Sequence, residues 1–228
     1  MLRLRHNIAL IALITACFSL AHAQSRSNEY NLPDFGEPAD QSLPLFEERQ
    51  LGAEVYRELL RRNLIQDDPE LSAYLNALGQ GLVEFSEADR AQRFRFFVIR
   101  DPSINAFALP GGYIGVHTGL LKAAENEAEL AAVLAHEIAH VTQRHIARQI
   151  NETKGWDLAS AALLLAALVA GGSDPDLVQA ALGIGMTLSY QQKVNFTRAH
   201  ELEADRIGIR TLSNAGFSPS GMENFFRR

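Results

Sequence analysis

The sequence predicts an α+β fold that is mostly helical and carries a small β-sheet. Several long segments place apolar residues three and four positions apart, which is the period of an amphipathic helix. Two short segments in the first half of the chain are instead aromatic and β-branched, as strands are. We expect the sheet to lie beside the longest of the helices, which carries three histidines and three glutamates.

The first 23 residues have the pattern of a secretory signal peptide. Arg3 and Arg5 give a basic start, residues 8–20 form a short apolar run, and Ala21-His22-Ala23 matches a small-x-small cleavage site. Cleavage would leave 228 − 23 = 205 residues, and the net charge would change from −6 to −8 because two arginines and no acid are lost. The alternatives are an uncleaved membrane anchor and a lipoprotein that carries its lipid on Cys17.

Charge and cysteine content exclude several classes of function. An acidic body argues against nucleic acid as a partner. Cys17 is the only cysteine and lies within the predicted signal, so the mature chain has no disulfide and no thiol nucleophile. Any metal site in it must therefore use histidines and carboxylates.

An extended arm and two helices are predicted next. Residues 24–46 are polar and hold three prolines, which indicates an extended N-terminal arm. Residues 47–63 have helical spacing of apolar side chains. A second helix is predicted to start at Asp67-Asp68-Pro69 and to reach about Phe85, because proline suits the first turn of a helix.

Two strands and a turn are predicted in the middle of the chain. Residues 94–99 are aromatic and β-branched, and Pro110-Gly111-Gly112 is a turn. The segment from Tyr113 through Ile114, Gly115 and Val116 to His117 alternates as a strand. Its edge is a candidate for binding an extended peptide substrate, and the alternative is an ordinary core hairpin.

The second half is predicted to be helical. A long helix covers residues 126–150. Residues 158–170 are rich in alanine and leucine but are fewer than the roughly twenty needed to span a bilayer. They form either a buried helix or an element that contacts a membrane surface or a client protein. Further helices are predicted at 176–188 and 196–212. Since another helix starts at Ser218-Pro219, we expect one domain, residues 47–228, that continues past Arg228.

The motif His136-Glu137-Ile138-Ala139-His140 carries the chemistry. Residues four apart share one face of a helix, so both imidazoles can reach one zinc ion. Glu137 is offset around the helix and can take a proton from an activated water molecule as a general base. The flanking apolar residues predict a buried helix, where unpaired imidazoles would be costly; the alternative is a surface His-Glu-His cluster without a metal.

A carboxylate on another predicted helix completes the candidate site. Glu201 and Asp205 are four positions apart, which suits one carboxylate on the metal and one that accepts the distal N–H of His136 or His140. Glu203 points elsewhere and is expected to be solvated. His200 is a rival ligand, but helical phase turns it about 100° away from Glu201.

These motifs resemble the HtpX-like and CAAX-prenyl-protease-like family of zinc metallopeptidases, within the gluzincins, and its periplasmic BepA-type (YfgC-type) branch. The shared elements are Asn105-Ala106-Phe107, Pro110-Gly111-Gly112, Gly119-Leu120-Leu121, Glu129-Leu130-Ala131, His136 to His140, His145, and Arg198 with Glu201-x-x-Ala204-Asp205-x-x-Gly208. The resemblance implies a gluzincin-like metallopeptidase domain that binds one Zn²⁺ per chain, with Glu201 as the third ligand.

The resemblance also implies a periplasmic endopeptidase that degrades misfolded or stalled envelope proteins and aids outer-membrane protein assembly. Unfolded envelope proteins would be its substrates, with the outer-membrane assembly machinery as a partner and peripheral contact with a membrane. BepA-type proteins continue into a segment with a regulatory histidine and a tetratricopeptide-repeat domain, which this chain does not include. The rival functions are a periplasmic chaperone with a latent or structural zinc site and a membrane-embedded protease.

Two further expectations concern residues around the motif. His145 is expected to be structural, because a spacing of five turns it away from the zinc side. Tyr190, His117 and Arg198 are open alternatives for a group that stabilises the oxyanion.

Overall fold

The computed structural model describes residues 43–89, 91–152, 162, 165 and 190–227, and the side chains of 149–152 and 190–197 are not among those described. In chain order the elements are α3 (Leu45–Arg61), α4 (Pro69–Val83), β1 (Arg95–Ile99), β2 (Ala106–Leu109), η1 (Pro110–Gly112), β3 (Tyr113–His117), α5 (Thr118–Ala123), α6 (Glu127–Thr142), α7 (His145–Glu152), α10 (Tyr190–Asn214) and α11 (Ser220–Arg227). The prediction of a mostly helical α+β fold is confirmed.

Several predicted segments lie outside the described residues. They are the signal peptide with Cys17, the arm as far as residue 42, and the helices at 158–170 and 176–188 apart from Ala162 and Leu165. In the part of the chain that is described, no helix is both long and apolar enough to cross a membrane.

The helix α4 begins where the sequence predicted. The Asp68 side chain accepts hydrogen bonds from the backbone N–H groups of Glu70 and Leu71, and Pro69 occupies the first turn. An aspartate at this position satisfies backbone donors that the first turn leaves without partners.

The three strands form one sheet in the order β1-β3-β2. Strand β3 pairs in parallel with β1 and antiparallel with β2, so it is the central strand. The prediction that the Tyr113–Val116 strand offers its edge to a peptide is therefore wrong, because both edges of β3 are already hydrogen-bonded. The outer edge of β1 is partly covered by a bridge between Ile65 and Ile99. Strand β2, which the sequence did not reveal, forms the other edge of the sheet.

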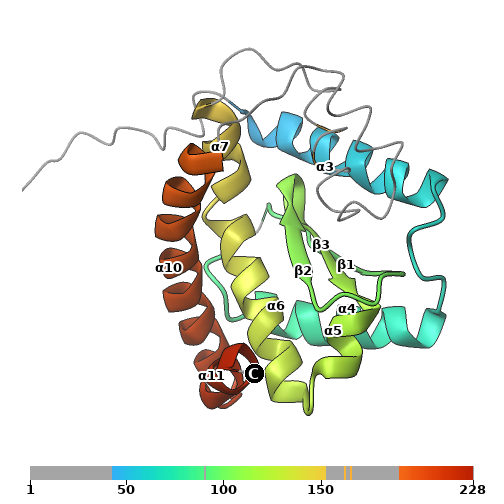
Figure 1. The fold of residues 1–228 in the computed structure, drawn as a ribbon, viewed down its shortest axis with the longest axis vertical. Coiled ribbons are helices and arrows are strands. Elements are labelled where there is room, and N and C mark those ends of the chain that lie inside the picture. The colour runs from blue at the N-terminus through green and yellow to red at the C-terminus, as the bar shows by residue number, and fades with distance from the viewer. Residues whose placement is uncertain (1–42, 90, 153–161, 163–164, 166–189, 228) are drawn as a thin grey trace, which may run out of the picture. The chain divides into compact units, whose positions relative to one another are not determined.

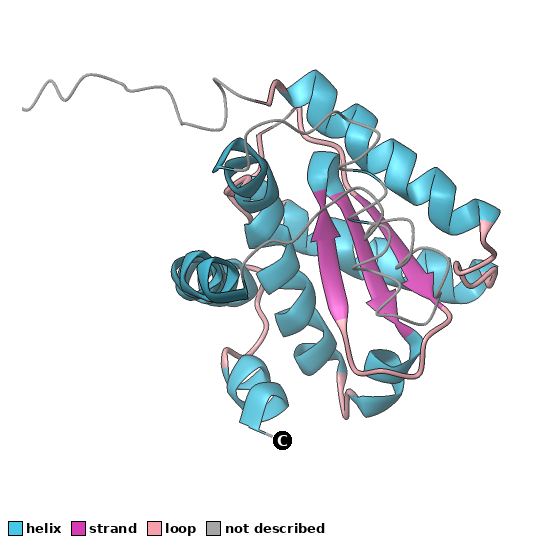
Figure 2. Ribbon diagram, turned by 45° about the horizontal axis from the view of Figure 1, so that its top comes forward, coloured by secondary structure: helices cyan, strands magenta, loops and turns pink. Residues whose placement is uncertain are grey.

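Helices cover both faces of the sheet. Phe97 and Ile99 point to the face that packs on α3, whereas Phe96 and Val98 point to the face that packs on α4 and α6. Figure 1 shows the sheet between α3 and α6, with α10 alongside α6, and Figure 2 shows the three strands side by side. The alternation of side chains along β1 thus divides the core into two apolar clusters.

The predicted helix at 126–150 is in fact two helices, α6 and α7, separated by a break at Gln143 and Arg144. Arg144 has a left-handed backbone, with φ of 54°. Its guanidinium is buried and donates to the Glu48 carboxylate at 2.7 Å and to the backbone carbonyl of Leu43 at 2.6 Å. These bonds tie the end of α6 to the start of α3.

Small residues bring α10 onto α6. Ala139 on α6 packs with Ala204 and Ile207 on α10, and all three are buried. A Cβ atom added to Gly208 would lie only 3.0 Å from the backbone nitrogen of His136. The two helices are therefore close enough for short acidic side chains on α10 to reach the histidines of α6.

Candidate metal centre

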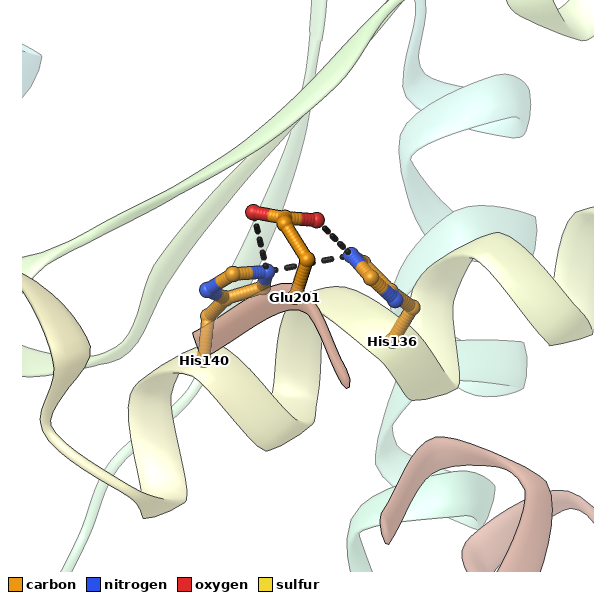
Figure 3. A group of neighbouring side chains, drawn as sticks. All are labelled: His136, His140 and Glu201. Atoms are coloured by element: carbon orange, nitrogen blue, oxygen red, sulfur yellow. Dashed lines mark hydrogen bonds and ion pairs between the residues drawn. The ribbon is translucent and has the colours of Figure 1, made fainter. Parts of the chain in front are cut away.

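His136 and His140 on α6 face Glu201 on α10 (Figure 3). The two Nε2 atoms lie 3.0 Å apart. The Glu201 carboxylate oxygens lie 3.2 Å from His136 Nε2 and 3.6 Å from His140 Nε2. Among the described residues these three side chains form a group whose ligand atoms all lie within 4.8 Å of one another.

The donor set fits a zinc ion. Two imidazoles and one carboxylate are a ligand set of catalytic zinc sites, which leave a fourth position open. With zinc–ligand bonds of about 2.0–2.1 Å, tetrahedral ligand atoms lie roughly 3.3–3.4 Å apart, which is close to the separations seen here. Small adjustments of these side chains would suffice to hold the ion.

Asp205 lies behind His136, one helical turn after Glu201. Its Oδ1 is 2.9 Å from His136 Nδ1. The two atoms are close enough for a hydrogen bond but are not aligned for one, and Nδ1 is buried without a hydrogen-bond partner among the described residues. A small rotation of the carboxylate would align the pair. The carboxylate is therefore placed to accept the Nδ1 proton, which leaves Nε2 free to bind a metal.

Glu137 faces a cavity of about 410 Å³ that His136, His140 and Glu201 also line. Ala106 and Ala108 of β2 form part of its wall. The backbone N–H of Ala108 hydrogen-bonds the Glu137 carboxylate. Glu137, the predicted general base, and an edge strand thus meet at His136, His140 and Glu201, which are called the metal group here.

Apolar side chains line much of the rest of the same cavity. They are Ile104, Phe107, Leu120, Val133, Ile146, Phe225 and Phe226. Phe107 and Leu120 belong to the motifs quoted above, whereas no motif in the sequence pointed to the others. The Phe226 ring lies 6.0 Å from the His136 ring although it is 58 % exposed. The cavity therefore offers an apolar surface directly beside the metal group.

Burial and charge act in opposite directions on the acids of the site. Hydrogen bonds with His136 and His140 hold the pKa of Glu201 well below its usual range. Burial raises the pKa of Glu137. Burial alone would lower the pKa of His136, but its hydrogen bond to Glu201 and the surrounding carboxylates raise it overall. The pKa of Glu201 is thus shifted towards the ionised form, whereas the pKa of Glu137 is shifted towards the protonated form.

His145 and Glu203 lie elsewhere than the sequence indicated. His145 Nδ1 is 2.9 Å from His140 Nδ1, so this ring contacts a metal-group histidine instead of facing away. Glu203 is only partly exposed, and its carboxylate is paired: it lies 3.1 Å from both His145 Nε2 and Arg148 Nη1. Burial lowers the pKa of His145 to about 4, so its ring is neutral at pH 7. His200 is buried and stacks on His145 outside the metal group.

Two of the three candidates for oxyanion stabilisation, His117 and Arg198, do not line the cavity. His117 is buried on the α3 side of the sheet, where it contacts Ser103 and Phe107. Arg198 is exposed and is not part of the cavity wall. The side chain of Tyr190 lies outside the described residues.

A helix that bears H-E-x-x-H beside an edge strand, with a carboxylate supplied by a second helix, defines the metallopeptidase class. Comparison with known families agrees with this class. The sequence profile named Peptidase family M48 matches residues 69–226. The chain belongs to Peptidase family M48.

The chain is also similar to individual proteins over most of its length. The chain is 38 % identical over 202 residues to the beta-barrel assembly-enhancing protease of Escherichia coli K12, covering 86 % of this chain and 40 % of that protein. A Vibrio cholerae protein that carries the same name provisionally is 43 % identical over 207 residues, or 90 % of this chain and 42 % of that protein. A mitochondrial metalloendopeptidase of Schizosaccharomyces pombe is 29 % identical over 184 residues, or 79 % and 51 %. The chain spans about two fifths of the length of these bacterial relatives.

Proposed function

We propose that this chain is a zinc-dependent endopeptidase of the bacterial periplasm. The observation that carries the proposal is the convergence of His136, His140 and Glu201 at one point, with Glu137 facing the same cavity. We propose that the first three residues hold the ion and that Asp205 orients His136. When bound, zinc would act as a Lewis acid that polarises a substrate carbonyl and lowers the pKa of water, so that a base can deprotonate the water for attack.

Glu137 is proposed to carry out the proton transfers. Glu137 removes a proton from the attacking water and returns it to the leaving amine. Burial favours the protonated form of this carboxyl, and the Ala108 N–H hydrogen bond favours the ionised form, so the two effects oppose each other. This balance suits a group that must both accept and release a proton.

The substrate is proposed to lie along β2, not along β3. His117 N–H donates to the Asn105 carbonyl, and the register pairs Phe107 with Gly115. In an antiparallel ladder the backbone groups of the intervening residues, Ala106 and Ala108, then point to the outer edge. Since the Ala108 N–H already donates to Glu137, an extended peptide can pair with the other outward backbone groups and pass beside Glu137.

The proposed substrates are misfolded or stalled envelope proteins, including outer-membrane β-barrel precursors. The support comes from relatives named beta-barrel assembly-enhancing protease and from the signal-peptide pattern of residues 1–23. The relatives' name also supports a role beside the outer-membrane assembly machinery. Unfolded chains suit an edge-strand site because their backbone groups are not yet paired.

The test is cleavage of an unfolded protein by zinc-loaded chain, with Glu137→Gln as the matched control. The amide of this variant would keep the side-chain shape and remove the base. We expect fragments on a gel with the wild type only, while both proteins bind one zinc ion. Protection of the unfolded protein from aggregation by both, without cleavage by either, would instead support the chaperone function and refute the peptidase.

A further inference from the structure

A second group of polar side chains lies behind His140, on the side away from Glu201. It consists of His145 and Arg148 on α7 and His200 and Glu203 on α10, and is called the His145 cluster here. His145 is only 3 % exposed and His200 is 6 % exposed. Their rings stack with centroids 4.1 Å apart and planes 3° from parallel, so the His145 ring is held in one orientation.

The contacts of His145 form a chain with one consistent proton arrangement. His140 Nε2 points at Glu201 and His136, so a metal bound there requires the proton of His140 to sit on Nδ1. That N–H faces His145 Nδ1 at 2.9 Å, which must then accept. The proton of His145 consequently sits on Nε2, where it donates to Glu203 at 3.1 Å.

Arg148 fixes the far end of this chain. Its Nη1 donates to the Glu203 carboxylate at 3.1 Å, which keeps that carboxylate ionised and directed at His145. A carboxylate that accepts from an imidazole increases the electron density on that ring. The second nitrogen of His145 then becomes a better acceptor for His140.

We infer that His145 is a positioning residue for His140, fixing its tautomer and strengthening its Nε2 as a metal donor, with Glu203 and Arg148 holding His145 in turn. The inference rests on the proposed metal site. Asp205 serves His136 directly, whereas a buried histidine and a carboxylate together serve His140. Because α7 follows the break at Arg144, that break is what turns His145 back towards the metal helix.

The experiment measures zinc affinity by competition with a chelator, and thermal unfolding of the same proteins after metal removal. Glu203→Gln removes the charge at a partly exposed position. His145→Phe keeps a stackable ring but removes both hydrogen bonds, and His145→Asn returns an acceptor near the Nδ1 position. Glu54→Gln is the control, because it makes the same charge change on the exposed face of α3.

We expect His145→Phe to weaken zinc binding by about 10- to 100-fold, as loss of outer hydrogen-bond partners does. Glu203→Gln should weaken it by about tenfold, at the lower end of that range, because its charge acts through one more hydrogen bond. His145→Asn should recover part of the loss, and Glu54→Gln should change nothing. The visible spectrum of the cobalt-substituted protein should shift in the two weakened variants.

Wild-type zinc affinity in Glu203→Gln and His145→Phe would overturn the inference, and so would a lower unfolding temperature without any change in zinc affinity. If His145→Phe does not fold, Glu203→Gln decides alone. Tight zinc binding by a wild type that cleaves nothing would refute the proposed peptidase while leaving the positioning role intact. A wild type that binds no zinc would refute both.

Discussion

Replacing Gly208 by alanine should separate α10 from α6 and weaken the metal site. The new Cβ would lie 3.0 Å from His136 N and 3.1 Å from its Cα, whereas ordinary contacts start at 3.4 Å. The helices must therefore move apart by about 3.4 − 3.0 = 0.4 Å at this point. Overpacking of this kind costs about 1–3 kcal/mol, and alanine regains about 1 kcal/mol through its helix propensity.

The displacement extends along α10 to Glu201, which lies about 10 Å towards the N-terminus of the same helix. Functional sites tolerate misplacements of their side chains of about 0.5 Å. A shift of about 0.4 Å at Glu201 would be close to that limit. We expect zinc affinity to fall by about tenfold, in line with losses in the surroundings of metal ligands.

The matched control for this substitution is Gly81→Ala in α4, where an added Cβ meets nothing within 4 Å. Urea unfolding after metal removal should show Gly81→Ala to be slightly stabilising and Gly208→Ala to be less stable than it by about 1–3 kcal/mol. Equal stabilisation by both substitutions, with unchanged zinc affinity, would refute the close-approach argument.

Three other outcomes are expected. Glu48→Ala should lower the free energy of unfolding in urea by about 3–5 kcal/mol, because it leaves the buried Arg144 without its carboxylate. The control Glu54→Ala, on the exposed face of α3, should lower it by less than about 1 kcal/mol, and equal losses would contradict this. After metal removal, the unfolding-temperature difference between wild type and Glu201→Gln should be largest between about pH 4.5 and 6.5. The lowered pKa of Glu201 adds stability that is lost as pH falls below that window, and the raised pKa of His136 adds stability that is lost as pH rises above it; a flat difference would refute the pairing. Zinc at 100 times its dissociation constant should stabilise the protein by about 2.7 kcal/mol, and an unchanged unfolding temperature would show that the folded state does not bind it.

Features set by local spacing could be predicted from the sequence. The aspartate and proline at the start of α4 and the period of apolar residues in α3 are examples. Helical phase on one element was also enough to place His136 with His140, and Glu201 with Asp205, on single faces. These predictions needed no knowledge of how the helices meet.

Features set by contacts between distant segments could not be predicted. Strand β2 is short and alanine-rich, so it has no β-branched signal, yet it forms the sheet edge at the metal group. The break at Arg144 contains no glycine or proline, and buried bonds to Glu48 and Leu43 stabilise it. Glu203 was expected to be solvated because phase on α10 alone does not reveal that α7 covers that side.

Among the described residues no strand pairs with the outer edge of β2, and the substrate position proposed there has a consequence for which proteins would be attacked. Hydrogen bonding through backbone groups depends little on the side chains, so the proposed site would select a substrate by whether its backbone groups are already paired. A closed barrel has no strand to offer, whereas a precursor has one only until its own neighbours pair with it. Cleavage would then compete with folding: a substrate that completes its barrel quickly would not be cut, and one that stays unpaired for longer would be.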